Sequence, residues 1–109
     1  MTYVRPHRPM FYMIYEDHST APMEEPVDHF AWAVMKDNEQ LCRVAKSDLE
    51  TLHISTVFLG RDMNYSGDPE LFETMVFNGE REVYCRRYST WEQAAKGHWE
   101  TVEYARNCL

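Results

Sequence analysis

The sequence predicts an α+β protein in which a short antiparallel β-sheet of about four to five strands is packed by a C-terminal helix and an N-terminal helix. Three observations lead to this prediction. Short segments rich in β-branched and aromatic residues recur through residues 41–88. The dipeptide Asn78-Gly79 is the commonest two-residue hairpin turn. Apolar residues in the segment 91–105 recur at helical spacing.

The chain has the length and composition of one globular domain. It has 109 residues, of which 44% are hydrophobic and 27% charged. We therefore predict a single domain over 1–109, with a strand and loop in 1–25, and a helix, the sheet and the C-terminal helix in 26–109. Aromatic residues reach 14%, which fits a core or a binding surface, since large rings dominate both.

The chain is acidic, with a formal net charge of −7. Direct binding to nucleic acid and docking on anionic membranes both need clustered Lys and Arg, so we expect neither. An acidic surface fits a basic protein surface, including one that normally holds nucleic acid. Acidity also serves solubility alone, so the charge by itself leaves the partner open.

The cysteines and the N-terminus indicate a cytoplasmic protein. The three cysteines are dispersed without a C-x-x-C pair, which is typical of reduced thiols and not of disulfides or a thiolate zinc site. Residues 1–9 contain basic side chains, but the apolar run that follows, 10–15, is too short for the core of a signal sequence. No stretch approaches transmembrane length.

In chain order, residues 10–15 are an apolar and aromatic run typical of an edge strand, and 18–25 read as a loop. A helix is expected to begin at Pro26, since proline suits the first helical turn, and to end at residues 37–38. The face of this helix expected to pack inward consists of Val27, Phe30, Ala31 and Val34.

The sheet is predicted from four segments. Residues 41–46 and 53–59 form strands, and a polar loop over 60–70 follows. Residues 71–77 and 81–88 then pair as a hairpin around Asn78-Gly79. The segments 53–59 and 71–77 are largely apolar on both faces, whereas a sheet with one solvated face would alternate cleanly. We therefore expect the second face to be covered by the N-terminal segment or by a second copy in a homo-oligomer.

The last helix is expected to begin near Ser89. Ser89 with Glu92, or Thr90 with Gln93, matches a capping box. The face expected to pack on the sheet consists of Trp91, Ala94, Ala95, His98, Val102 and Ala105.

The loop has the spacing of a calcium-binding EF-hand, with glycine at the sixth position. Its oxygen-bearing side chains are Asp62, Asn64, Ser66, Asp68, Glu70 and Glu73. An EF-hand needs a preceding helix, however, and the residues before this loop form a strand pattern. An ordinary turn-rich connection is the favoured interpretation, and a looser metal site is the alternative.

Glu73, His98 and His53 are expected to approach one another between the sheet and the last helix. Glu73 and His98 could act there as a general acid and base. Together with Asp62 and His53, they could instead ligate a divalent metal ion. The favoured alternative is a buried His98 that is satisfied by a carboxylate or a backbone oxygen and orients the helix.

Tyr65 is the aromatic residue most readily assigned to a protein interface, because it lies in the long polar loop. Acidic neighbours would form the rim of that interface, namely Asp62, Asp68 and Glu70. No nucleophile elbow, phosphate-binding glycine loop or dinucleotide fingerprint is present in the sequence.

Three blocks, STVFLGRD at 55–62, LFETMVF at 71–77 and RYSTW at 87–91, occur in order before Gly97-His98. Together they resemble a group of small proteins encoded by bacteriophages and prophages, over about half of the chain, residues 52–99. The resemblance implies a phage protein in a bacterial cytoplasm and brings no activity with it. It highlights Asp62, Glu73, Thr74 and His98. Such proteins are expected to have a histidine at position 63, so Met63 would mark a lost site.

The leading functional hypothesis is a non-enzymatic binding module that acts on a host protein, such as a defence or nucleic-acid enzyme, and needs no cofactor. The alternative is a small metal-dependent enzyme or metal-stabilised protein that uses Asp62, Glu73 and His98.

Overall fold

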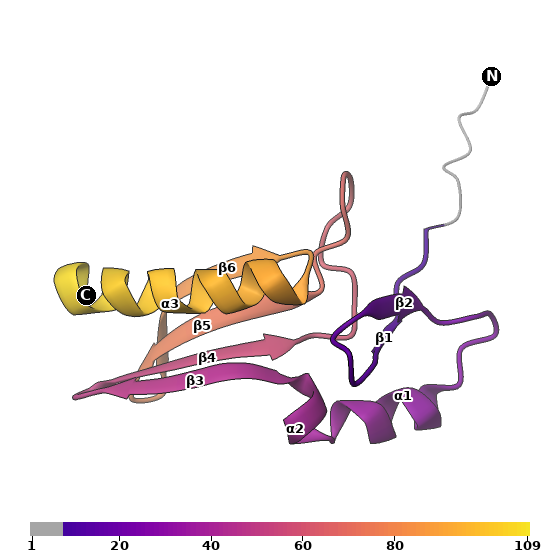
Figure 1. The fold of residues 1–109 in the computed structure, drawn as a ribbon, viewed down its shortest axis with the longest axis horizontal. Helices are drawn as coiled ribbons and strands as arrows, with labels where there is room; N and C mark the ends of the chain where they lie inside the picture. The colour runs from indigo at the N-terminus through magenta and orange to yellow at the C-terminus, as the bar shows by residue number, and fades with distance from the viewer. Residues whose placement is uncertain (1–7) are drawn as a thin grey trace.

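The computed structural model describes residues 8–109, so residues 1–7 of the predicted N-terminal strand and loop lie outside it. The protein has an α+β fold in which one four-stranded antiparallel sheet carries the C-terminal helix α3 (Trp91–Cys108) across one face (Figure 1). The sheet has the order β3-β4-β5-β6, so each strand pairs with its neighbour in the sequence. These strands are β3 (Arg43–Leu49), β4 (Leu52–Phe58), β5 (Phe72–Asn78) and β6 (Arg81–Tyr88).

A smaller N-terminal layer packs at one end of this sheet (Figure 1). It contains the strands β1 (Tyr12–Ile14) and β2 (Thr20–Pro22) and the helices α1 (His29–Lys36) and α2 (Glu39–Cys42). The strand β2 lies in the segment predicted as a loop, and α2 overlaps the start of the strand predicted over 41–46. In the part of the chain that the structure describes, no helix is both long and apolar enough to cross a membrane.

Helix α3 packs on the sheet as its periodicity predicts. Thr90 and Gln93 form the capping box that begins the helix. Ala94, Val102 and Ala105 are buried against apolar residues of β4 and β5. The helix lies unusually close to β6 at Gly97, where a Cβ atom would come within 2.2 Å of the Tyr88 ring. Glycine at this position therefore sets how closely the helix approaches the sheet.

Helix α1 differs from its prediction in start and orientation. It begins at His29, because the Asp28 side chain caps it by accepting a hydrogen bond from the backbone N–H of Ala31. Its predicted inward face is exposed: Phe30 is 80% and Val34 57% exposed. The opposite face packs inward, with Met35 buried.

The contacts that hold α1 explain this orientation. The indole N–H of Trp32 donates to the backbone oxygen of Gly60 at 3.0 Å, and the Lys36 amine donates to the backbone oxygen of Phe58. Phe58 is the last residue of β4, and Gly60 lies two residues further on, where its oxygen also accepts from the backbone N–H of Tyr12 in β1. The helix therefore packs against β1, α2 and the end of the sheet, so the prediction that an N-terminal helix packs the sheet is matched only at this end.

The hairpin β5–β6 is present, with its turn shifted by one residue. Asn78 still pairs with Arg81, and the two turn residues are Gly79, at φ +64°, and Glu80. On the face of the sheet opposite α3, the apolar side chains Val57, Met75 and Phe77 are half-buried. Whether a second copy covers this face remains a prediction.

Candidate functional site

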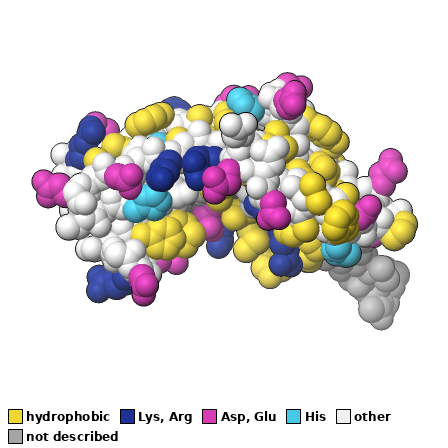
Figure 2. All heavy atoms as spheres, turned by 90° about the horizontal axis from the view of Figure 1, so that it is seen from below, with side chains coloured by type: hydrophobic (Ala, Val, Ile, Leu, Met, Phe, Trp, Pro, Cys, Tyr) yellow, Lys and Arg dark blue, Asp and Glu magenta, His cyan; other side chains and the backbone are white. Residues whose placement is uncertain are grey.

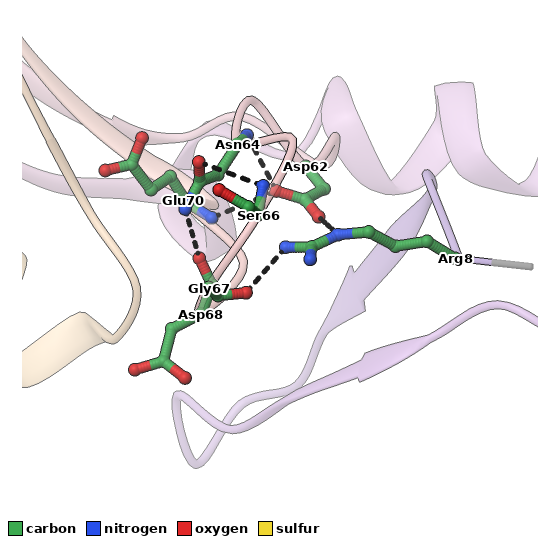
Figure 3. A network of polar contacts seen from close by, with 7 residues as sticks. All are labelled: Arg8, Asp62, Asn64, Ser66, Gly67, Asp68 and Glu70. Carbon is green, nitrogen blue, oxygen red and sulfur yellow. Dashed lines mark hydrogen bonds and ion pairs between the residues drawn. The ribbon is translucent and has the colours of Figure 1, made fainter. Parts of the chain in front are cut away.

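The loop between β4 and β5 is organised around the carboxylate of Asp62, which is 3% exposed (Figure 3). One oxygen, Oδ1, accepts hydrogen bonds from the backbone N–H groups of Asn64 at 2.9 Å and Glu70 at 3.1 Å. The other oxygen, Oδ2, accepts from Nε of Arg8 at 2.6 Å. A single side chain thus joins both ends of the loop to the N-terminal segment.

Further hydrogen bonds close the loop (Figure 3). Nη2 of Arg8 donates to the backbone oxygen of Gly67 at 2.9 Å, and Nδ2 of Asn64 donates to the backbone oxygen of Asp68 at 2.9 Å. The side-chain oxygens of Asp62 and Asn64 are therefore used in turn hydrogen bonds, and the Arg8 guanidinium supplies the positive charge beside Asp62. The element before the loop is β4, so the helix that an EF-hand requires is replaced by a strand.

The electrostatics of Asp62 favour its ionised form. Burial opposes ionisation, but the hydrogen bonds from Arg8 and from the backbone of Asn64 and Glu70 outweigh it. The pKa of Asp62 is therefore held below its ordinary value. The ion pair between Asp62 and Arg8, here called the clamp, is therefore charged at neutral pH and connects the loop to the N-terminal segment.

The loop extends away from the sheet (Figure 1) and presents its middle residues to solvent. Tyr65 is 83% exposed and Asp68 is also exposed, whereas Glu70 is half-buried. Of the four residues predicted for an interface, Asp62 is thus placed as an internal support and the other three lie at or near the surface. Met63 is 41% exposed, and its backbone N–H donates to the backbone oxygen of Glu70.

A second polar cluster lies between α3 and the sheet, where His98 is fully buried. Nδ1 of His98 lies 2.7 Å from the hydroxyl of Thr56, and Nε2 lies 2.9 Å from the hydroxyl of Ser47. The hydroxyls of Thr56 and Thr74 are 2.5 Å apart, and the Tyr88 hydroxyl donates to Thr74 at 3.0 Å. Five side chains, one from each strand of the sheet and one from α3, therefore form one hydrogen-bonded chain.

The tautomer of His98 and the directions of the hydroxyl hydrogen bonds are linked. With the proton on Nε2, this nitrogen donates to Ser47 and Nδ1 accepts from Thr56. With the proton on Nδ1, both directions are reversed. Burial lowers the pKa of His98, which agrees with a neutral ring. The arrangement orients α3 through hydroxyl groups, in place of the carboxylate or backbone oxygen expected from the sequence.

Glu73 lies on the other face of the sheet. Its Oε2 accepts from Nε of Arg87 at 2.9 Å and from the Cys85 thiol at 3.3 Å. Burial and the hydrogen bond to Glu73 raise the pKa of Cys85 to about 11, so this thiol is protonated and unreactive at neutral pH. Arg87 neutralises Glu73, and the hydrogen bond to Glu73 raises the pKa of Arg87.

The structure does not bring the proposed metal ligands together. Glu73 alternates with Thr74 along β5, so it points away from His98. His53 pairs with Asp48 through Nδ1 at 2.6 Å, at the opposite end of the strands from Glu73. Asp62 is in the loop, paired with Arg8. Within residues 8–109, no group of three or more His, Cys, Asp or Glu side chains is arranged to hold a metal ion.

Sequence reasoning missed the partners that complete both clusters. Arg8 is one of the basic side chains of residues 1–9, and Ser47 lies directly after the strand predicted over 41–46. Thr56 and Thr74 occupy core-facing positions on adjacent strands. A buried hydroxyl needs a hydrogen-bond partner, so two threonines at apolar positions were a usable signal for a polar cluster beneath the helix.

Comparison with known proteins gives no match to a family model, to a curated protein or to a solved structure. The resemblance of residues 52–99 to phage proteins therefore stays a prediction.

Proposed function

We propose that this protein is a non-enzymatic protein-binding module, encoded by a phage and acting in the bacterial cytoplasm on a host protein. The observation that carries the proposal is the loop over residues 60–70. Asp62 and Arg8 hold its base, and Tyr65 projects from its middle with 83% of its surface exposed.

Such a loop suits binding for an energetic reason. Ordering a flexible loop at an interface costs free energy, about 0.5–1.5 kcal/mol for each immobilised side chain. The hydrogen bonds of Asp62 and Asn64 order this loop before a partner arrives. Tyrosine combines a large apolar ring with a hydroxyl and has few rotatable bonds, so Tyr65 can act as the anchor of the contact.

The partner surface that fits this loop is basic. Asp68 is exposed beside Tyr65, Glu70 is half-buried nearby, and the chain has a net charge of −7. Host enzymes that bind nucleic acid, defence enzymes among them, carry basic surfaces and are the partner class we propose. Blocking such a surface needs no catalytic group and no cofactor on this chain.

The test is a pull-down of the tagged full chain from bacterial host lysate at low and high salt. We expect one stoichiometric partner that weakens at high salt and is lost with Tyr65→Ala. Tyr15→Ala is the matched control, because Tyr15 is 49% exposed but lies in the β1–β2 turn. Equal recovery with both variants, or no partner at either salt, would rule the proposal out.

The metal-dependent alternative ranks below binding, because Asp62, Glu73 and His98 lie in three separate places. It is checked by elemental analysis of the purified protein. A stoichiometric divalent metal that is lost in Glu73→Gln, with folding retained, would favour the alternative.

A further inference from the structure

The outward face of α1 is an apolar surface that the fold leaves uncovered among the described residues. Phe30 is 80% and Val34 57% exposed, and Ala33 between them is also exposed. These residues have the spacing i, i+3 and i+4, which places them on one side of the helix, and Asp37 at i+7 continues the row. Figure 2 shows hydrophobic side chains gathered in the half of the molecule that holds α1, β1 and β2.

The contacts that attach α1 to the rest of the protein come from the opposite side of the helix. Trp32 and Lys36 bind α1 to the end of β4 from the opposite side, and Met35 is buried there. The ring of Phe11 packs edge-on against Trp32, with centroids 5.4 Å apart. The helix therefore has a complete inward face, and its outward apolar residues are held in a fixed position.

Both ends of this surface are acidic. Asp28 caps the start of α1 and Asp37 its end, and Glu39 follows in α2; all three are exposed. The one lysine of the helix, Lys36, directs its amine inward to the Phe58 backbone oxygen. A second copy packed symmetrically on this face would place carboxylates near carboxylates, which disfavours self-association there.

We infer that the outward face of α1 docks in an apolar groove of a partner protein that is flanked by Lys or Arg side chains. The inference rests on the proposed function and adds a second contact surface to the loop. An amphipathic helix that binds in a groove makes its main contacts through apolar side chains at positions i, i+3 and i+4. Phe30 and Val34 are the anchors, Ala33 allows close approach, and Asp37 meets the basic rim.

The first test is photo-crosslinking in bacterial cells that express the full chain. A benzophenone amino acid replaces Phe30 in one variant and Tyr65 in another, and crosslinked peptides are sequenced by mass spectrometry. We expect position 30 to crosslink to an apolar segment of a host protein with Lys or Arg close in sequence. A crosslink between two copies, or to a segment without basic residues, overturns the inference.

The two positions separate failure of this inference from failure of the proposed function. Crosslinking at position 65 but not at 30 leaves the loop-based function standing and removes the α1 surface. The absence of crosslinks at both positions counts against both.

The second test measures affinity for the crosslinked partner after its purification. We expect Phe30→Ser to weaken binding at least tenfold and Val34→Ser severalfold, because buried anchors carry most of the binding energy. Asp37→Asn should reduce the salt dependence of the association rate. Tyr15→Ser is the control that removes an exposed aromatic ring elsewhere, since Tyr15 is 49% exposed. If Phe30→Ser stays within twofold of the wild type, the surface is not a docking site.

Discussion

Helices α1 and α3 both carry an apolar row at helical spacing, yet only α3 buries it. Ala94, Val102 and Ala105 of α3 are at most 3% exposed. The corresponding residues of α1, Phe30 and Val34, face solvent. Periodicity thus identified the packing face of α3, whereas in α1 it identified the face that is left exposed.

The polar contacts explain the difference. The inward face of α1 offers the Trp32 indole and the Lys36 amine, and the backbone oxygens of Phe58 and Gly60 at and just after the end of β4 accept from them. The hydrogen bonds to these groups orient the helix so that the row of Phe30 and Val34 faces solvent. In α3 the polar group His98 lies within the apolar row, so the same rotation satisfies both. The orientation of a surface helix is therefore decided by hydrogen bonds as well as by burial.

The largest effect on stability is expected from adding a side chain at Gly97, where α3 lies closest to β6. In Gly97→Ala the new methyl group would lie 2.2 Å from the Tyr88 ring, which is buried and hydrogen-bonded to Thr74. We expect a loss of about 3 kcal/mol in the free energy of unfolding, net of the gain of about 1 kcal/mol from alanine in a helix. Denaturant unfolding measures it, with Lys96→Ala as the control. A loss below about 1 kcal/mol would show that the helix shifts easily.

The matching change under α1 is Gly60→Ala. Gly60 has φ +74°, and a Cβ atom there would lie 2.9 Å from both Trp32 and Lys36. We expect about 2 kcal/mol of destabilisation from backbone strain and displacement of α1. Hydrogen exchange should show faster exchange in α1 while β4 and β5 keep their protection. Equal loss in both regions would mean that the two layers unfold together.

The buried His98 of α3 makes the free energy of unfolding depend on pH. Because burial lowers the folded-state pKa of His98, the unfolded chain takes up a proton first as the pH falls. Stability from this group is full above the unfolded value, about 6.5, and is lost as the pH falls below it. The slope for one proton is at most about 1.4 kcal/mol per pH unit. Unfolding curves of wild type and His98→Gln at several pH values check this, and an unchanged slope would refute it.

The smallest effect belongs to the exposed row of α1. Phe30→Ser removes a ring that is 80% exposed, so we expect a change of less than about 0.5 kcal/mol in the free energy of unfolding. Thermal and denaturant unfolding measure it. A loss above about 1 kcal/mol would mean that Phe30 supports the fold itself, and its proposed role in docking would lose its basis.

The sequence predicted the parts of the fold that depend on local spacing. The α+β class, the antiparallel sheet, the β5–β6 hairpin and the packing face of α3 follow from turn formers and periodicity. The orientation of α1 could not be predicted in the same way, because it depends on Trp32 reaching Gly60, 28 residues away. The same reason applies to the loop, whose key ion pair joins Arg8 to Asp62.

The candidate site was predicted less well than the fold. Alternation places Glu73 and His98 on different surfaces only when the side of the sheet that α3 covers is known. The strand prediction alone does not say which face of the sheet α3 covers. The exposure of Tyr65 follows from its position in a long polar loop, and its role at an interface stays a prediction.

The meander order of the sheet has a consequence for how the chain reaches its native state. Each strand pairs with its neighbour in the sequence, so most of the sheet forms from contacts of short separation, which favours fast folding. The clamp between Arg8 and Asp62 joins residues 54 positions apart, so its formation costs more loop-closure entropy than the pairing of neighbouring strands. We expect the transition state to contain β4, β5 and β6 and to lack the clamp. Asp62→Asn should therefore speed unfolding with little change in the folding rate, and slowed folding would contradict this order.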